Sequence, residues 1–276
     1  MATHTIVGLV LALVSAVAVN WAYTREHDAV EQLPPFSPRQ PFRFIRLLLR
    51  DRQWLIGFGT ESAGWLVYVA ALRLAPLSLV QAIGASGIAV LALVTAHGHP
   101  SRLPRLERLA VVVAFAGLVL LSLSLVDTTQ SDHAPDPANV VLWLACVLAG
   151  GLLLARSGFG RAGAPALGLG AGVLFAGGDI SAKLVVYGGA WILAAFALVV
   201  CYGLGTTILQ GGFQHGSALT SAGLATLATN ALPIAAGFVV FDEELPQNGK
   251  GALQVAAFAL LVLSAGLLAR AVRAKR

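Results

Sequence analysis

The stretch TIVGLVLALVSAVAVNWAY, residues 5–23, runs for nineteen residues without a charged side chain. An α-helix of about 20 apolar residues is long enough to cross the roughly 30 Å hydrocarbon core of a bilayer. Eight further stretches of similar length and polarity follow it along the chain. They are residues 53–74, 77–97, 107–126, 139–155, 164–187, 190–209, 217–241 and 251–270. The sequence therefore predicts an all-α fold, a polytopic membrane helical bundle of about nine transmembrane helices.

The composition agrees with this fold and argues against a soluble enzyme. Of the 276 residues, 57% are hydrophobic and 11% are charged, whereas a soluble domain carries about 25% charged residues. The sequence contains no nucleophile elbow, nucleotide-binding loop or paired-carboxylate hydrolase pattern. We therefore expect no enzymatic activity, no catalytic residues and no cofactor.

Basic and acidic residues fall in alternate loops when the nine stretches are threaded back and forth through a bilayer. One side holds the six arginines of residues 24–52, Arg102, Arg105, Arg108, Arg156, Arg161, Arg270, Arg273, Lys275 and Arg276. The other side holds Asp127, Asp132, Asp136, Asp242, Glu243 and Glu244, with Lys250 as its loop cation. Because cytoplasmic loops are enriched in Lys and Arg, we expect the N-terminus outside and the C-terminus in the cytoplasm of a bacterial cytoplasmic membrane. The net charge of +5 is then a topology signal, and we expect no nucleic-acid partner.

The chain divides into two halves with related patterns. Residues 1–126 hold four spans and residues 139–276 hold five, with an external polar linker at residues 127–138. In residues 72–123 a short turn, a small-residue helix, a polar loop and an apolar helix follow one another, and residues 213–268 repeat this order. The first copy of the turn is predicted outside and the second inside. Two halves of opposite orientation are typical of inverted-repeat transporters, whose substrate site lies near the bilayer midplane.

Two further segments have a regular pattern. Residues 39–50 place four arginines at helical spacing on one face and Phe42, Ile45 and Leu49 on another. This pattern predicts either an amphipathic helix on the cytoplasmic leaflet or an extension of the second span into the cytosol. The glycine-rich run of residues 168–178 predicts close packing between helices, because small residues let two backbones approach.

Glu61 is the first charged residue inside a span that bears on function. It lies about eight residues into the second span and has no opposite charge at helical spacing on its own helix. A lone carboxylate in a membrane needs a partner or a proton. It could be a proton-coupling acid, a cation ligand, or a buried hydrogen-bonding group. Trp65 and Tyr68 share its helical face at spacings of four and seven, and we expect all three to face a cavity between two lobes.

Asp179 and Lys183 are the second charged feature inside a span. They are four residues apart and therefore on one helical face, in the order that suits an intrahelical ion pair. Such a pair is either a structural device or a switch that a substrate or proton breaks. Polar uncharged residues within the spans either join helices or bind ligands. We expect Asp179 and Lys183 to line the cavity from the lobe opposite Glu61. The uncharged residues that we expect to line it are Gln81, Gln210 and Asn230.

The sequence ALRLAPLSLVQAIGASGIAVLAL, residues 71–93, resembles the drug/metabolite transporter superfamily, of the EamA-like kind. Three features are similar to its NIPA-type, magnesium-transporter-like branch: a first span followed by a long basic loop, Gly-Thr-Glu at residues 59–61, and DISAKLVV at residues 179–186. The resemblance covers nearly the whole chain. It implies a two-lobed helical bundle with alternating access and secondary transport of metabolites, drugs, nucleotide sugars, lipid-linked groups or cations.

We therefore expect a secondary transporter of a small solute, with Glu61 as the coupling or substrate acid. A first alternative is a transporter of magnesium or another divalent cation that uses Glu61 and Asp179 as ligands; apart from these two carboxylates, no metal site is expected. A second alternative is a membrane scaffold that holds lipid-linked envelope enzymes and transports nothing. The expected partners are the lipid bilayer and a small-molecule or ion substrate, and homodimerisation stays open.

Overall fold

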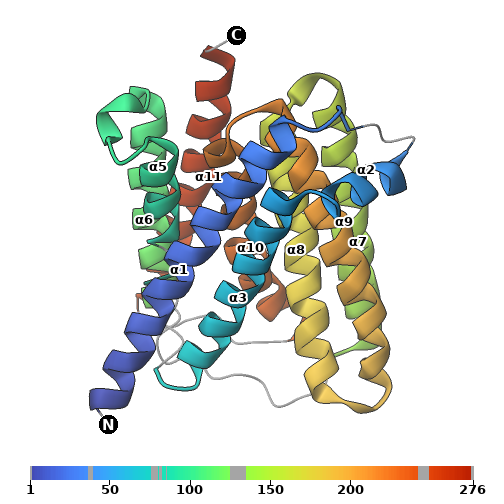
Figure 1. The fold of residues 1–276 in the computed structure, drawn as a ribbon. Coiled ribbons are helices and arrows are strands. Elements are labelled where there is room, and N and C mark those ends of the chain that lie inside the picture. Colours follow the sequence, from blue (N-terminus) through green and yellow to red (C-terminus); the bar gives the residue numbers. More distant parts are fainter. Residues whose placement is uncertain are drawn as a thin grey trace. The chain divides into compact units, whose positions relative to one another are not determined.

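The fold is built from helices in the part of the chain that the structure, a computed structural model, describes (Figure 1). That part comprises residues 2–36, 40–75, 80, 83–84, 86–124, 135–241 and 249–274. The helices are α1 (Ala2–Glu31), α2 (Pro41–Leu48), α3 (Arg52–Leu72), α5 (Gly87–Thr95), α6 (Arg105–Ser124), α7 (Pro137–Ser157), α8 (Ala164–Tyr187), α9 (Ala194–His215), α10 (Ala218–Val240) and α11 (Lys250–Ala274). No strand occurs within these ranges. The predicted all-α class is thereby confirmed.

Seven of the described helical segments are long and apolar enough to cross a bilayer. They are His4–Glu31, Arg105–Ser124, Pro137–Gly160, Ala164–Val185, Gly189–His215, Ala218–Gly237 and Lys250–Val272. Helix α3, which carries Thr60, Glu61 and Ser62 in its middle, is not one of the seven. The predicted span at residues 77–97 is described only in part. The chain is a multi-pass membrane protein, and the number of nine spans stays a prediction.

The outward-facing side chains of these helices are those of a lipid-facing surface. Phe196 is 78% exposed, Val262 72% and Leu142 64%. Scattered apolar residues are normal on a soluble protein, but a continuous apolar surface of large side chains is not. In a bilayer the same surface faces acyl chains and carries no penalty.

Contacts divide the chain into two compact units, and the first consists of residues 1–126, 217–219 and 248–276. Within it α1 packs along α3, and α6 packs along α11. Small residues bring α6 and α11 together: a Cβ on Gly117 would lie 2.9 Å from Leu261 Cδ2, and the Ser264 hydroxyl donates to the Ala110 carbonyl at 2.9 Å. Helix α11 thus groups with the N-terminal helices, whereas the division into halves at residues 127–138 stays a prediction. Residues 127–134 of that linker lie outside the described ranges.

The second unit, residues 127–216 and 220–247, is organised around α8. Helix α8 packs against α7 and α9, and two of its glycines contact α10. A Cβ on Gly168 or Gly172 would collide with the carbonyl oxygen of Ser221 or Ala225. The predicted close packing of the glycine-rich run is therefore confirmed for these two residues. A buried core cluster of this unit consists of Val140, Ile180, Leu184, Ala236, Val240 and Phe241.

Helix α2 is separate from α3, which decides between the two predictions for residues 39–50. The chain turns at Leu49 and Arg50, and the Asp51 carboxylate accepts a hydrogen bond from the Trp54 backbone N–H at 2.8 Å. This is an N-terminal cap, so α3 begins at Arg52. The interpretation that the second span simply extends into the cytosol is wrong. Contact of α2 with the membrane surface stays a prediction.

The basic loops of the first unit lie at one end of it. Figure 1 shows the C-terminal end of α1, helix α2, the turn between α5 and α6, and the C-terminal end of α11 at the same end. These segments carry most of the arginines assigned to the cytoplasmic side. The loop acids that define the opposite side, Asp136 excepted, lie outside the described ranges.

Candidate functional site

Glu61 lies on the side of α3 that contacts α1. The two helices are antiparallel and close: a Cβ on Gly57 would lie 2.7 Å from Glu26 Cγ, and one on Gly64 would lie 2.8 Å from Val19 Cγ2. The Ser15 hydroxyl donates to the Gly64 carbonyl at 2.7 Å. Small residues at a helix interface permit this approach, and they bring the polar groups of the two helices within reach of one another.

Glu61 is joined by side-chain hydrogen bonds to Glu26 and Tyr23 of α1. Glu26 has no exposed surface at all, and Glu61 is partly buried. An ionised carboxylate can only accept hydrogen bonds, so two carboxyl groups can bond to each other only if one of them carries a proton. We name Glu26, Glu61 and Tyr23 the carboxylate pair site. If the two carboxyl groups share a hydrogen bond, the pair carries one proton and about one negative charge.

The sequence predicts that Glu61 needs a partner or a proton, but it does not identify Glu26. The first apolar stretch ends at Tyr23, and the sequence therefore predicts that Glu26 lies in the loop that follows. The helix instead continues to Glu31. The available signal is the spacing of Ser15, Val19, Ala22 and Glu26, at intervals of four, three and four, which marks one continuous helical face.

The expectation that Trp65 and Tyr68 face a cavity together with Glu61 stays a prediction. Trp65 is 55% exposed. Tyr68 is partly buried and packs against a cluster formed by Ala12, Ala71, Ala75 and Val80. Gln81 lies outside the described ranges.

Asp179 belongs to a second polar group, in the other unit. Its carboxylate accepts a hydrogen bond from the Tyr202 hydroxyl of α9 at 2.5 Å. The Tyr202 ring needs the absence of a side chain at Gly178, because a Cβ there would lie 2.6 Å from the ring. The Phe175 ring lies 5.7 Å from the Tyr202 ring. Asp179 thus has an aromatic surrounding built by α8 and α9.

Lys183 does not form the expected ion pair with Asp179 in the part of the chain that the structure describes. The Lys183 ammonium lies 3.9 Å from the centroid of the Phe241 ring, which is a cation–π contact. A spacing of four residues places Asp179 and Lys183 on one face of α8. Asp179 nevertheless bonds to Tyr202 of α9, and Lys183 contacts Phe241, the residue after α10.

The two remaining polar candidates differ in burial. Gln210 is fully buried within α9. Asn230 is exposed, and its amide donates to the Thr226 carbonyl of the same helix at 2.8 Å. Such a bond satisfies the side chain locally. The described residues contain no group of three or more His, Cys, Asp or Glu side chains arranged for a metal ion.

The chain is similar to a curated protein of Arabidopsis thaliana, the "probable magnesium transporter NIPA9". The two sequences are 24% identical over 257 residues, which cover 84% of this chain and 72% of the plant protein. No family model matches the chain, and no solved structure matches it.

Proposed function

We propose that the chain is a secondary membrane transporter of divalent cations, with magnesium as the first candidate, and that Glu26 and Glu61 bind the cation together. The observation that carries the proposal is the carboxylate pair site between α1 and α3. The sequence offers one uncompensated carboxylate, Glu61, which is a thin anionic site for a divalent cation. Glu26 supplies the second carboxylate, and the similarity to a probable magnesium transporter supports the same substrate class.

The pair suits the chemistry of magnesium. Mg²⁺ prefers oxygen ligands and is usually bound by one or two carboxylates while it keeps several waters. Two carboxylates neutralise its charge, and waters complete its coordination. Because the described residues hold no larger group of ligands, we expect a hydrated ion at this site. A fully dehydrated ion would need more protein oxygens.

The shared proton gives the site a means of coupling. Both carboxylates must be ionised to bind a divalent cation well, so the proton between them leaves when the cation enters. The proton and the cation thus compete for the same oxygen atoms. A site that exchanges one for the other can drive cation movement with a proton gradient and needs no nucleotide.

A second candidate function is transport of a small organic solute, as in transporters of the EamA-like kind. The observation that favours it is the polar group around Asp179. A carboxylate beside the rings of Tyr202 and Phe175 is typical of an organic ligand site, where a few polar groups lie among aromatic ones.

The proposed transporter has nine spans with the N-terminus outside and the C-terminus in the cytoplasm of a plasma membrane. Residues 53–126 and 190–270 would then be inverted repeats that superpose after a rotation of about 180° around an axis in the membrane plane, as in other alternating-access transporters.

The orientation predicts which residues an impermeant thiol reagent labels in intact cells. The background lacks both natural cysteines, through Cys146→Ala and Cys201→Ala. We expect Ala138→Cys, which is exposed at the start of α7, to be labelled in intact cells. We expect Ala274→Cys to be labelled only after permeabilisation. Labelling of Ala274→Cys in intact cells would show that the orientation is wrong.

Uptake into proteoliposomes tests the proposed function. The purified full chain is reconstituted with a magnesium indicator inside the vesicles, and Mg²⁺ is added outside. We expect saturable Mg²⁺ entry that vesicles without protein lack and that an outward proton gradient accelerates. Uptake of organic solutes without any divalent-cation uptake would favour the second candidate. A folded protein that moves neither would favour the scaffold interpretation.

A further inference from the structure

Helix α2 presents two kinds of exposed side chain next to each other. Arg43 and Arg46 are three residues apart on α2, Arg50 lies in the turn that follows the helix, and all three are exposed. We name these three residues the arginine stripe. Phe42 and Leu49 are 84% and 57% exposed and lie beside that stripe. The opposite face of the helix is buried through Phe44 and Leu48, which are each 3% exposed.

The position of α2 is fixed on both sides. The Phe44 ring packs edge-to-face on the Phe36 ring, with centroids 5.0 Å apart. On the other side, the Asp51 cap begins α3 within three residues of the end of α2. The first turns of α3 expose Leu55 and Ile56. The exposed side chains of α2 therefore lie next to a surface that faces acyl chains.

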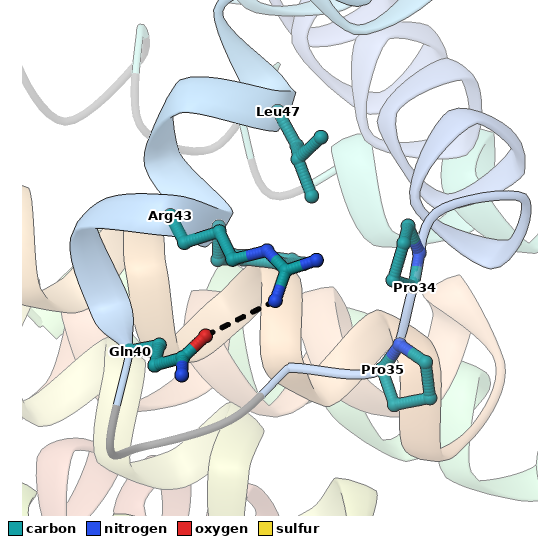
Figure 2. Close-up of a pocket in the computed structure, with 6 residues that line it drawn as sticks. Pro34, Pro35, Gln40, Arg43 and Leu47 are labelled. Atoms are coloured by element: carbon teal, nitrogen blue, oxygen red, sulfur yellow. Dashed lines mark hydrogen bonds between the residues drawn. The ribbon is translucent and has the colours of Figure 1, made fainter.

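A cavity of about 110 Å³ lies between α2 and the segment that precedes it. Figure 2 shows the Arg43 guanidinium in this space, with Gln40 on one side and Pro34 and Pro35 on the other. Arg43 Nη1 donates to Gln40 Oε1 at 3.2 Å. A guanidinium has five N–H donors, so this bond leaves donors for an oxyanion that enters the cavity. Phe44 and Leu47 complete its lining.

Within the described residues, no acidic side chain forms an ion pair with Arg43, Arg46 or Arg50. The nearest acid in sequence, Asp51, uses its carboxylate to cap α3. A stripe of unneutralised arginines beside exposed apolar side chains is the pattern of a helix that lies in a membrane interface and attracts anionic lipids.

We propose that α2 binds the phosphate groups of anionic phospholipids. Arg43, Arg46 and Arg50 contact the headgroup phosphates, and the Arg43 cavity holds one of them. Phe42 and Leu49 insert among the upper parts of the acyl chains. Arginine suits this role because its planar fork can donate two parallel hydrogen bonds to a phosphate.

Spin-labelled lipids test the proposal on the full chain, in bilayers of phosphatidylcholine at low salt. We expect spin-labelled phosphatidylglycerol to be immobilised by the protein in preference to spin-labelled phosphatidylcholine, at least about fivefold, which corresponds to a single basic residue at the surface. The variant Arg43→Gln/Arg46→Gln/Arg50→Gln should lose this preference. High salt should weaken the preference in the wild-type protein, because screening shortens the reach of the charges.

The matched control is Arg102→Gln/Arg105→Gln/Arg108→Gln, which removes the same charge from exposed positions before α6 and in its first turn. It should keep the preference. Wild-type protein without a preference, an unchanged preference in the α2 variant, or an equal loss in the control would each overturn the proposal. Loss of the preference on addition of millimolar inorganic phosphate would assign the cavity to a free anion. If the triple variant does not fold, the three single substitutions are measured instead, and each should lose part of the preference for phosphatidylglycerol. A preference equal to that of the wild-type protein in all three single variants would overturn the proposal.

Discussion

Replacing either Glu26 or Glu61 with glutamine is expected to lower Mg²⁺ uptake into proteoliposomes by about 100-fold or more. Even the loss of a group that only supports a metal ligand costs 10–100-fold in affinity, and each substitution here removes a proposed ligand. Glutamine also cannot release a proton to admit the cation. The fold should survive, because the glutamine amide can donate to the remaining carboxylate in place of the shared proton.

The double variant Glu26→Gln/Glu61→Gln should be no worse than either single variant. Residues that act as a unit are not additive. The control is Glu31→Gln, which removes a carboxylate from the exposed end of α1 and should transport like the wild-type protein. Wild-type uptake by Glu61→Gln or by Glu26→Gln would end the proposal, provided that thermal unfolding shows both proteins to be folded.

Gly172→Ala is expected to destabilise the protein by about 3 kcal/mol, at the upper end of the usual cost of overpacking a close contact. A Cβ at this position would collide with the Ala225 carbonyl oxygen, and it would lie 2.8 Å from both Ala225 Cα and Ala228 Cβ. These are backbone and near-backbone atoms, so α8 and α10 must move apart. Thermal unfolding of the purified protein in detergent measures the effect, and Gly172→Leu should yield no folded protein.

Gly203→Ala is the matched control for that experiment. Gly203 lies in α9 of the same unit, and nothing lies within 4 Å of the position its Cβ would take. The substitution should be neutral or slightly stabilising, because alanine restricts the unfolded chain more than glycine does. Equal unfolding temperatures for Gly172→Ala and Gly203→Ala would show that α8 and α10 do not pack closely at Gly172.

The sequence predicts the helices well and the carboxylate pair site only in part. Long apolar stretches locate most helices because membrane thickness sets their length. The run 168–178 predicts close packing because small residues let the backbones of two membrane helices approach. The sequence does not predict Glu26 as a site residue. Hydropathy places the end of a span at the first charged residues, whereas α1 continues beyond Arg25 to Glu31.

Side-chain partners are harder to predict than helices. Asp179 and Lys183 have the spacing of an ion pair, yet Tyr202 and Phe241 offer them contacts from elsewhere in the same unit. Spacing fixes which face a residue occupies, and tertiary packing then decides its partner.

The central claim is that Glu26 and Glu61 share a proton and exchange it for the transported cation. Infrared difference spectroscopy of the full chain, recorded before and after addition of Mg²⁺, tests this claim without a transport assay. The account predicts a protonated carboxyl band in the apo protein that Mg²⁺ removes, with no such Mg²⁺-sensitive band in Glu61→Gln. A carboxyl band that is unchanged by Mg²⁺ in the wild-type protein, or equally sensitive to Mg²⁺ in Glu61→Gln, would contradict it.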